Sequence, residues 1–179
     1  ASGGRDCKVF IWSMNDTCEV SNTDLSGWIT SLSWAPLKSS SSNRLLASGS
    51  WDGAVTIWDV STTGNSISKK EELRAQGNAP VTALQFAPNG RFVIVASQDN
   101  SVRMWDIQSP AKPKLEFMTL APPTAVALSS KTQLIVIGDA LGTVYHLKFC
   151  TPQKKSEEQS PLNKHTPSSQ TAQSSKQEE

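Results

Sequence analysis

The chain has 179 residues, of which 37% are hydrophobic and 18% are charged, and its formal net charge is +1. These values are ordinary for a globular protein and give no global sign of a nucleic-acid-binding or membrane protein. No stretch approaches the roughly 18 consecutive apolar residues of a membrane helix, so we expect no membrane contact. The three cysteines are an odd number without C-x-x-C spacing. This argues against a disulfide framework or a zinc site and favours a reducing compartment.

A short motif recurs along the chain. "GSWDGAVTIWDV" spans residues 49–60, "ASQDNSVRMWDI" spans residues 96–107, and "SGGRDCKVFIW" stands at the beginning. Each copy has an aspartate followed six residues later by a tryptophan, in the pairs Asp6 and Trp12, Asp52 and Trp58, and Asp99 and Trp105. The tryptophans are 46 and 47 residues apart, a period typical of propeller blades. The motif therefore predicts a repeated structural unit rather than a catalytic site.

Between these motifs the sequence predicts short strands and no helix. Residues 28–36 and 81–88 alternate apolar and polar side chains and end at proline, as half-buried strands do. In each repeat a second strand follows, then a tight turn, the Trp-bearing third strand, and a more polar fourth strand, expected at residues 71–76 and 114–120. Ahead of the first complete set, only a third strand and a fourth near residues 16–22 are expected. The chain is therefore predicted to be all-β.

These motifs resemble the WD-repeat (WD40) family of β-propellers, over roughly residues 1–149. The resemblance implies a hydrogen-bonded network in each blade, made by the turn Asp, the third-strand Trp, a Ser or Thr, and a His. Ser48 is the expected hydroxyl partner in the second repeat. The family's His has no counterpart, because "LSGW" and "QGNAP" stand where it would precede the first strand. We therefore expect these blades to depend more on packing than on buried polar bonds.

The last repeat, "VIGDALGTVYHLKF", has lost its tryptophan and can be aligned in two ways. One alignment matches Gly142 with Gly53 and leaves Leu147 at the tryptophan position. The other starts from Asp139 and puts Tyr145 there. The first is preferred because it needs no gap.

The predicted strands make about three and a half four-stranded blades, whereas propellers usually close with four to eight. We therefore expect residues 1–149 to be the C-terminal blades of a larger propeller, whose missing strands come from upstream residues of the same parent chain. Residues 150–179 are dominated by Ser, Gln, Lys and Glu, which predicts a disordered tail. Degenerate last repeats followed by a polar tail also resemble the ends of telomerase-associated and NACHT-type WD proteins.

The resemblance divides the loops between two faces of the propeller. One face carries the loops from fourth to first strand and from second to third strand, and its candidate protein contacts are Arg5, Trp28, Trp51, Asn78, Gln98 and Asn100. Tryptophan and arginine are enriched in binding hot spots, although Trp28 and Trp51 can alternatively pack against the neighbouring blade. The opposite face has basic loops that can hold a phosphate backbone. Its candidate residues are Lys38, Arg44, Lys69, Lys70, Arg91, Lys112, Lys114 and Lys131.

The sequence offers no convergent catalytic set, because it lacks a phosphate loop and its repeated aspartates belong to separate blades. We therefore expect no enzymatic activity, no cofactor and no metal. The main hypothesis is a non-catalytic scaffold that binds other protein subunits in the cytoplasm or nucleus. The alternative is RNA or ribonucleoprotein binding through the basic face. A ubiquitin-ligase substrate receptor is disfavoured, because the resemblance implies Arg or Lys where this chain has Ser61 and Gln108.

Overall fold

Every regular element in the described part of the chain is a β-strand, so the all-β prediction is confirmed. The computed structural model describes residues 1–12, 18–22, 25–37, 43–61, 66–74, 77–129 and 134–148. The chain divides into two units, Ala1–Phe149 and Cys150–Glu179. The tail predicted at residues 150–179 lies outside the described residues.

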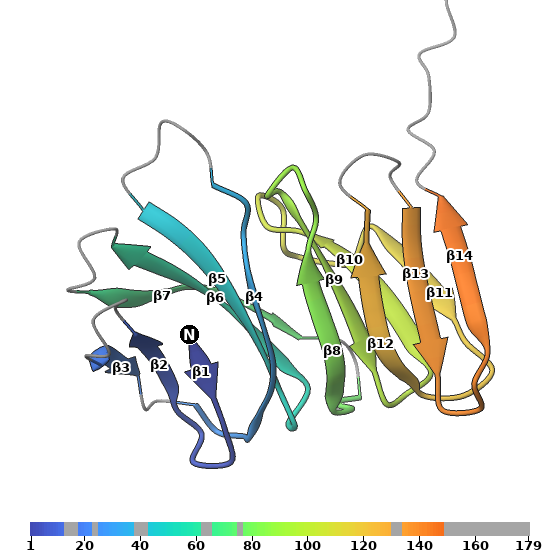
Figure 1. The fold of residues 1–179 in the computed structure, drawn as a ribbon, viewed down its shortest axis with the longest axis horizontal. Coiled ribbons are helices and arrows are strands. Elements are labelled where there is room, and N and C mark those ends of the chain that lie inside the picture. The colour runs from blue at the N-terminus through green and yellow to red at the C-terminus, as the bar shows by residue number, and fades with distance from the viewer. Residues whose placement is uncertain are drawn as a thin grey trace, which may run out of the picture. The chain divides into compact units, whose positions relative to one another are not determined.

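The strands form four antiparallel sheets, which we call blades 1 to 4 (Figure 1). Blade 1 contains β1 (Ser2–Gly3), β2 (Val9–Trp12) and β3 (Cys18–Asn22). Blade 2 contains β4 (Ile29–Trp34), β5 (Asn43–Ser50), β6 (Ala54–Ser61) and β7 (Ile67–Arg74). Blade 3 contains β8 (Val81–Phe86), β9 (Phe92–Ser97), β10 (Ser101–Asp106) and β11 (Leu115–Met118). Blade 4 contains β12 (Pro123–Leu128), β13 (Leu134–Asp139) and β14 (Val144–Lys148). Within each blade the strands pair in chain order.

This arrangement confirms the predicted partial propeller and corrects two of its details. Blade 1 has β1 in addition to the two strands expected there, because Ser2 and Gly3 pair with β2. Strand β7 begins at Ile67, four residues before the predicted fourth strand. Lys69 and Lys70 therefore lie within an outer strand and not in the loop that precedes it.

The turn between the second and third strands is equivalent in all four blades. The flanking residue pairs are Gly3 with Val9, Gly49 with Val55, Ala96 with Val102, and Gly138 with Val144. In each turn one residue adopts a left-handed backbone, with φ of 60° at Cys7, 81° at Gly53, 66° at Asn100 and 84° at Gly142. Because the turns superimpose in register, Leu147 takes the tryptophan position of blade 4. The gap-free alignment of the last repeat is therefore confirmed.

Apolar side chains fill the space between successive blades. Val9, Ile11 and Trp58 belong to the core cluster of blades 1 and 2, and Val55 and Trp105 belong to that of blades 2 and 3. A third cluster joins blades 3 and 4. Blades 2 and 3 are therefore held from both sides, since each of these two sheets buries apolar side chains on two packed faces, whereas blades 1 and 4 each have one packed face.

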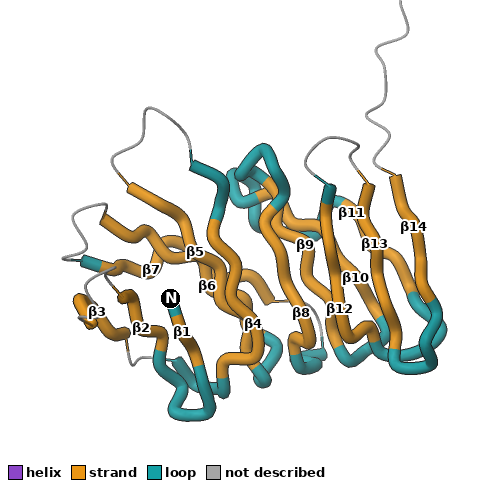
Figure 2. Tube along the Cα trace, in the orientation of Figure 1, coloured by secondary structure: helices purple, strands orange, loops and turns teal. Residues whose placement is uncertain are grey.

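The innermost strands β4, β8 and β12 lie side by side (Figure 2). Polar side chains of β4 bond across to the β8 backbone: Thr30 Oγ1 donates to the Val81 carbonyl at 2.7 Å, and Ser31 Oγ accepts from the Leu84 amide at 3.1 Å. Ser33 repeats this pattern two residues later. The polar side chains of β4 thus form hydrogen bonds between blades 2 and 3, where buried backbone groups need partners.

Candidate functional site

The repeated aspartates stabilise turns. The Oδ1 atom of each aspartate accepts a hydrogen bond from the backbone amide two residues later, at 3.3 Å for Asp6, 3.1 Å for Asp52 and 3.1 Å for Asp99. This is the local bond that aspartate typically makes in a turn. Each aspartate belongs to a different blade, so these carboxylates do not form a catalytic pair.

Two of the repeated tryptophans donate to a serine on the neighbouring strand. Trp58 Nε1 donates to Ser48 Oγ at 2.8 Å, and Trp12 Nε1 donates to Ser2 Oγ at 2.8 Å. In blade 3 the register puts Val95, which has no hydroxyl, at the position of Ser48. The Asp52 carboxylate accepts from Ser26, in the segment where the family's His would stand. Ser26 was missed by sequence reasoning, because a serine in a loop gives no specific signal.

Three of the six candidate protein contacts come together at one edge of blades 1 and 2. Arg5 lies in the turn between β1 and β2, Trp28 directly precedes β4, and Trp51 lies in the turn between β5 and β6 (Figure 1). The guanidinium carbon of Arg5 is 4.8 Å from the centroid of the Trp28 ring. The Trp28 and Trp51 rings are 6.0 Å apart and inclined by 40°. We call these residues the Arg5–Trp28–Trp51 cluster.

Both indoles of the cluster are accessible to a partner. Trp28 is 43% exposed and Trp51 is 48% exposed, whereas the repeat residue Trp58 is 1% exposed. Side chains of this size are usually buried in a core, and a group of them at a surface is a sign of a binding site. The cluster therefore has the composition and the exposure of an interaction surface.

The backbone beneath the cluster is held by hydrogen bonds. The Trp51 amide donates to the Trp28 carbonyl at 2.8 Å, and the Ile29 amide donates across to the Gly4 carbonyl of blade 1 at 2.9 Å. Because these bonds join the three loops that carry the cluster, its side chains project from a fixed support.

Asp52 ties the same loops to the outer strand of blade 2. Its carboxylate accepts from Ser26, and Arg74 Nη2 lies 3.3 Å from Oδ2. Burial acts to raise the pKa of Asp52, but hydrogen bonds from Ser26 and the Ala54 backbone and the charge of Arg74 lower it below its ordinary value. Asp52 therefore remains charged at neutral pH and supports the cluster as an anion.

The other three candidate contacts serve turns. Asn78 and Asn100 have left-handed backbones, with φ of 50° and 66°. The Asn100 carbonyl accepts from both the amide and the hydroxyl of Thr119, and the Gln98 amide donates to the Pro80 carbonyl at 2.9 Å. These contacts belong to the backbone, and the side chains of Asn78 and Gln98 are exposed.

Sequence reasoning missed two exposed leucines near the turns of blade 4, Leu120 in the segment that links β11 to β12 and Leu141 in the turn between β13 and β14. Leu120 is 78% exposed and Leu141 is 75% exposed. The Leu120 amide donates to the Tyr145 hydroxyl at 2.9 Å, that hydroxyl donates to Asp139, and Asp139 also accepts from the Leu141 amide at 3.0 Å. For Leu141 the sequence did contain a signal, because a leucine stands there at the turn position that aspartate occupies in the other three blades.

Several residues of the predicted basic face are engaged within the chain. Arg91 donates hydrogen bonds to both carboxylate oxygens of the buried Asp106, and its Nη2 atom is 2.6 Å from Oδ2. Lys69 pairs with Glu72, and Arg44 stacks over the Trp34 ring at 4.7 Å. Lys70, Lys112 and Lys114 are exposed, and Lys38 and Lys131 lie outside the described residues. The face is therefore less available to a phosphate backbone than the sequence alone predicts.

The Arg91–Asp106 pair makes stability depend on acid pH. The hydrogen bond from Arg91 is the main cause that lowers the pKa of Asp106 below its ordinary value of 3.8. Its contribution to stability is present above pH about 4 and is lost as the pH falls toward the lowered pKa of the folded state. We expect Asp106→Asn to reduce the melting temperature at neutral pH and to make its decline below pH about 5 shallower. Thermal unfolding of the full-length protein across this pH range measures both effects.

Asp59→Asn provides the matched control for this prediction. Asp59 has the same position in blade 2, and its Oδ1 atom has no hydrogen-bond partner among the residues that the structure describes. An Asp106→Asn protein whose melting temperature falls as steeply with acid as the wild type would contradict the assigned role of the pair.

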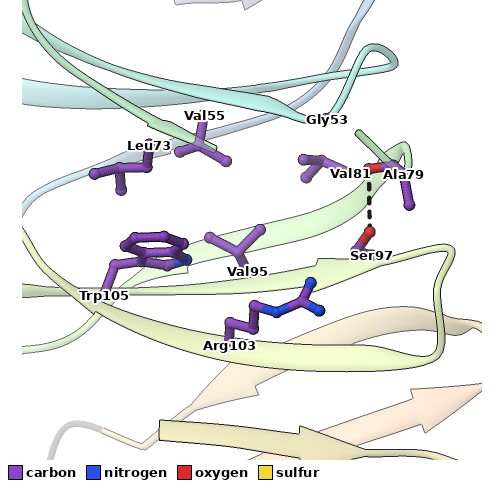
Figure 3. A pocket seen from close by; sticks show the side chains of 9 residues that line it. All are labelled: Gly53, Val55, Leu73, Ala79, Val81, Val95, Ser97, Arg103 and Trp105. Carbon is purple, nitrogen blue, oxygen red and sulfur yellow. Dashed lines mark hydrogen bonds between the residues drawn. The ribbon is translucent and has the colours of Figure 1, made fainter. Parts of the chain in front are cut away.

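A small cavity lies between blades 2 and 3 (Figure 3). Its walls are mostly apolar and include Val81 and Trp105, and Ser97 Oγ donates to the Ala79 carbonyl at 3.1 Å. Arg103 is the charged residue of the lining, and it pairs with Asp99 at 2.8 Å and with Glu116 at 2.7 Å. The lining therefore supplies no free acid, base or nucleophile for chemistry.

The described residues contain no group of three or more His, Cys, Asp or Glu side chains that could hold a metal ion. Within the same residues, no helix has the length and apolar character needed to cross a membrane.

Comparison with known proteins identifies the repeat. Residues 19–59 and 68–106 match the family model described as WD domain, G-beta repeat. Each matched segment covers most of the outer strand of one blade and the three inner strands of the next. The matched repeats thus link neighbouring blades.

Curated relatives share this similarity over part of their length. The chain is 36% identical over 110 residues to the Periodic tryptophan protein 2 homolog of Schizosaccharomyces pombe, covering 60% of this chain and 12% of that protein. It is 31% identical over 77 residues to COMPASS component SWD1 of Saccharomyces cerevisiae, covering 43% and 18%. It is 26% identical over 132 residues to Small ribosomal subunit protein RACK1 of Caenorhabditis elegans, covering 73% and 35%. The chain thus spans about a third or less of these relatives. From its repeats and its blades, the chain belongs to the WD-repeat family of β-propellers.

Proposed function

We propose that the chain is part of a non-catalytic scaffold that binds another protein through the Arg5–Trp28–Trp51 cluster. The main support is that the indoles of Trp28 and Trp51, each nearly half exposed, lie together beside the Arg5 guanidinium on loops joined by hydrogen bonds. Tryptophan and arginine dominate binding hot spots because they supply large contact area and directed hydrogen bonds. A fixed support lowers the entropy cost of binding.

The relatives' names support a role inside a larger assembly. One is named a component of COMPASS and another a protein of the small ribosomal subunit. For this chain we infer protein subunits as partners, in the cytoplasm or the nucleus. The Cys7 thiol, which forms no disulfide, supports a reducing compartment.

We also propose that further blades of the same parent chain cover the open face of blade 1. Trp58 and Trp105 are 1% and 3% exposed because the preceding blade packs on them, whereas the equivalent Trp12 is 50% exposed. A preceding blade would bury Trp12 in the same way, and upstream residues would supply the one strand by which blade 1 falls short of blades 2 and 3.

Affinity purification tests the proposed binding surface. We expect Trp51→Ala in the full-length protein to lose its partner, because truncating a hot-spot tryptophan costs about 2 kcal/mol or more. Leu37→Ala is the matched control, since Leu37 is 74% exposed on the opposite face. Mass spectrometry of the captured proteins, with and without ribonuclease, gives the readout.

The ribonuclease arm separates the two candidate functions. Partners that survive ribonuclease and disappear with Trp51→Ala support the scaffold. Partners that are still captured by the Trp51→Ala protein but disappear with ribonuclease would contradict the scaffold and support RNA binding through the basic face.

A further inference from the structure

Arg5 is the unpaired cation of the cluster. No carboxylate forms an ion pair with it in the described part of the chain, and its guanidinium instead lies over Trp28. The neighbouring Arg74 is occupied, because it pairs with both Asp52 and Glu72. The surface thus presents one guanidinium whose hydrogen-bonding edge is not satisfied by any side chain that the structure describes.

The position of Arg5 is set before any partner arrives. Its turn is closed by the Cys7 amide, which donates to the Gly4 carbonyl at 3.3 Å, and the left-handed backbone of Cys7 completes the turn. The Gly4 carbonyl also accepts from Ile29 of blade 2. Stacking on Trp28 limits the rotation of the side chain, so less conformational entropy is lost when the guanidinium binds.

We propose that the Arg5–Trp28–Trp51 cluster takes a protein segment that carries an Asp or Glu next to an apolar side chain. This inference rests on the proposed function and names its ligand. The carboxylate binds the guanidinium through two parallel hydrogen bonds, the geometry that Arg and carboxylate share. The apolar side chain packs on the ring of Trp51, because Trp51 has a larger exposed fraction than Trp28.

The charges of the cluster favour a single carboxylate over a nucleic acid. Single-stranded RNA also stacks on aromatic rings, but it needs a positively charged groove along its backbone. Among the described residues here, Arg5 and Lys8 of the same turn are the cations without an ion pair, and they lie with the carboxylates of Asp6, Asp52 and Glu72 in the same or adjoining segments. Arg5 can therefore neutralise one acidic side chain, whereas a run of phosphates would meet negative charge.

A thermodynamic cycle between protein and peptide tests the proposal. The probes are short synthetic peptides with one Glu beside one Leu in a Gly/Ser background, each paired with a peptide that has Gln in place of Glu. Binding to the full-length protein is measured by fluorescence anisotropy of a label on the peptide. We expect the Glu peptide to bind the wild type about tenfold more tightly than the Gln peptide, because the carboxylate makes charge-assisted hydrogen bonds.

Variants assign this preference to Arg5. With Arg5→Gln, the two peptides are expected to bind equally. Arg5→Lys keeps the positive charge but cannot make the two parallel hydrogen bonds of a guanidinium, so a reduced preference for the Glu peptide is expected. Trp51→Ala should weaken both peptides alike, because it removes the apolar contact. Lys148→Gln, which removes an exposed cation of blade 4, should retain the wild-type preference.

Three outcomes would overturn the inference: equal binding of both peptides to the wild type, a preference for Glu that persists in Arg5→Gln, or Arg5-dependent binding of oligouridylate in place of the peptides. Failure here is distinguishable from failure of the proposed function. Capture of a protein partner that depends on Trp51, combined with no preference for the acidic peptide, would leave the scaffold standing and remove its assigned ligand.

Discussion

Replacing Trp58 by alanine is expected to lower the free energy of unfolding by about 3–5 kcal/mol. Trp58 is fully buried between blades 1 and 2, where it packs with Val9, Ile11 and Leu46. Its truncation leaves a cavity that these neighbours cannot fill without moving their strands, and it also removes the bond to Ser48. Pulse proteolysis of the full-length protein across a urea series measures the loss.

Trp12→Ala is the informative comparison for Trp58→Ala. If a further blade covers Trp12 in the full-length protein, its replacement should cost nearly as much as that of Trp58. A cost within about 0.5 kcal/mol, as for ordinary surface positions, would contradict the proposed coverage. A loss below about 1 kcal/mol for Trp58→Ala itself would contradict its assignment as a core residue.

Gly53→Ala is expected to destabilise the protein by two separate effects. Gly53 has φ of 81°, a conformation that costs a residue with a side chain about 1–3 kcal/mol. A Cβ atom there would also lie 2.7 Å from the carbonyl carbon of Asn78 and 2.8 Å from its Cα. Because these are backbone atoms, relief requires the segment ahead of blade 3 to move. Urea unfolding of the variant measures the sum of both effects.

Gly142→Ala separates the two contributions. Gly142 occupies the equivalent turn of blade 4 with φ of 84°, but a Cβ atom there would meet no atom within 4 Å. We expect Gly53→Ala to exceed Gly142→Ala by about 1–3 kcal/mol, the cost of overpacking. Equal losses would show that the contact with Asn78 relaxes freely and that the left-handed backbone alone explains the glycine.

Local chemistry explains why so much of the fold was predictable from the sequence. A strand's alternation has a period of two, and a turn aspartate bonds to the amide two residues later, so both signals lie within a few residues. The period of the tryptophans then predicted the first three blades, and the strand and turn pattern around Gly142 predicted the last one. The start of β7 was missed because "ISKKEELR" has no clean alternation, and pairing with β6 decides that this segment is extended.

The candidate site needed more than the sequence. The sequence by itself determined the all-β repeat, the turn residues and the presence of Arg5, Trp28 and Trp51 in loops of one face. Only the tertiary structure decided that these three meet and that Arg91 is paired with Asp106. The physical reason is that such contacts join different loops and strands, and their distances depend on the packing and register of the blades, which no local pattern encodes.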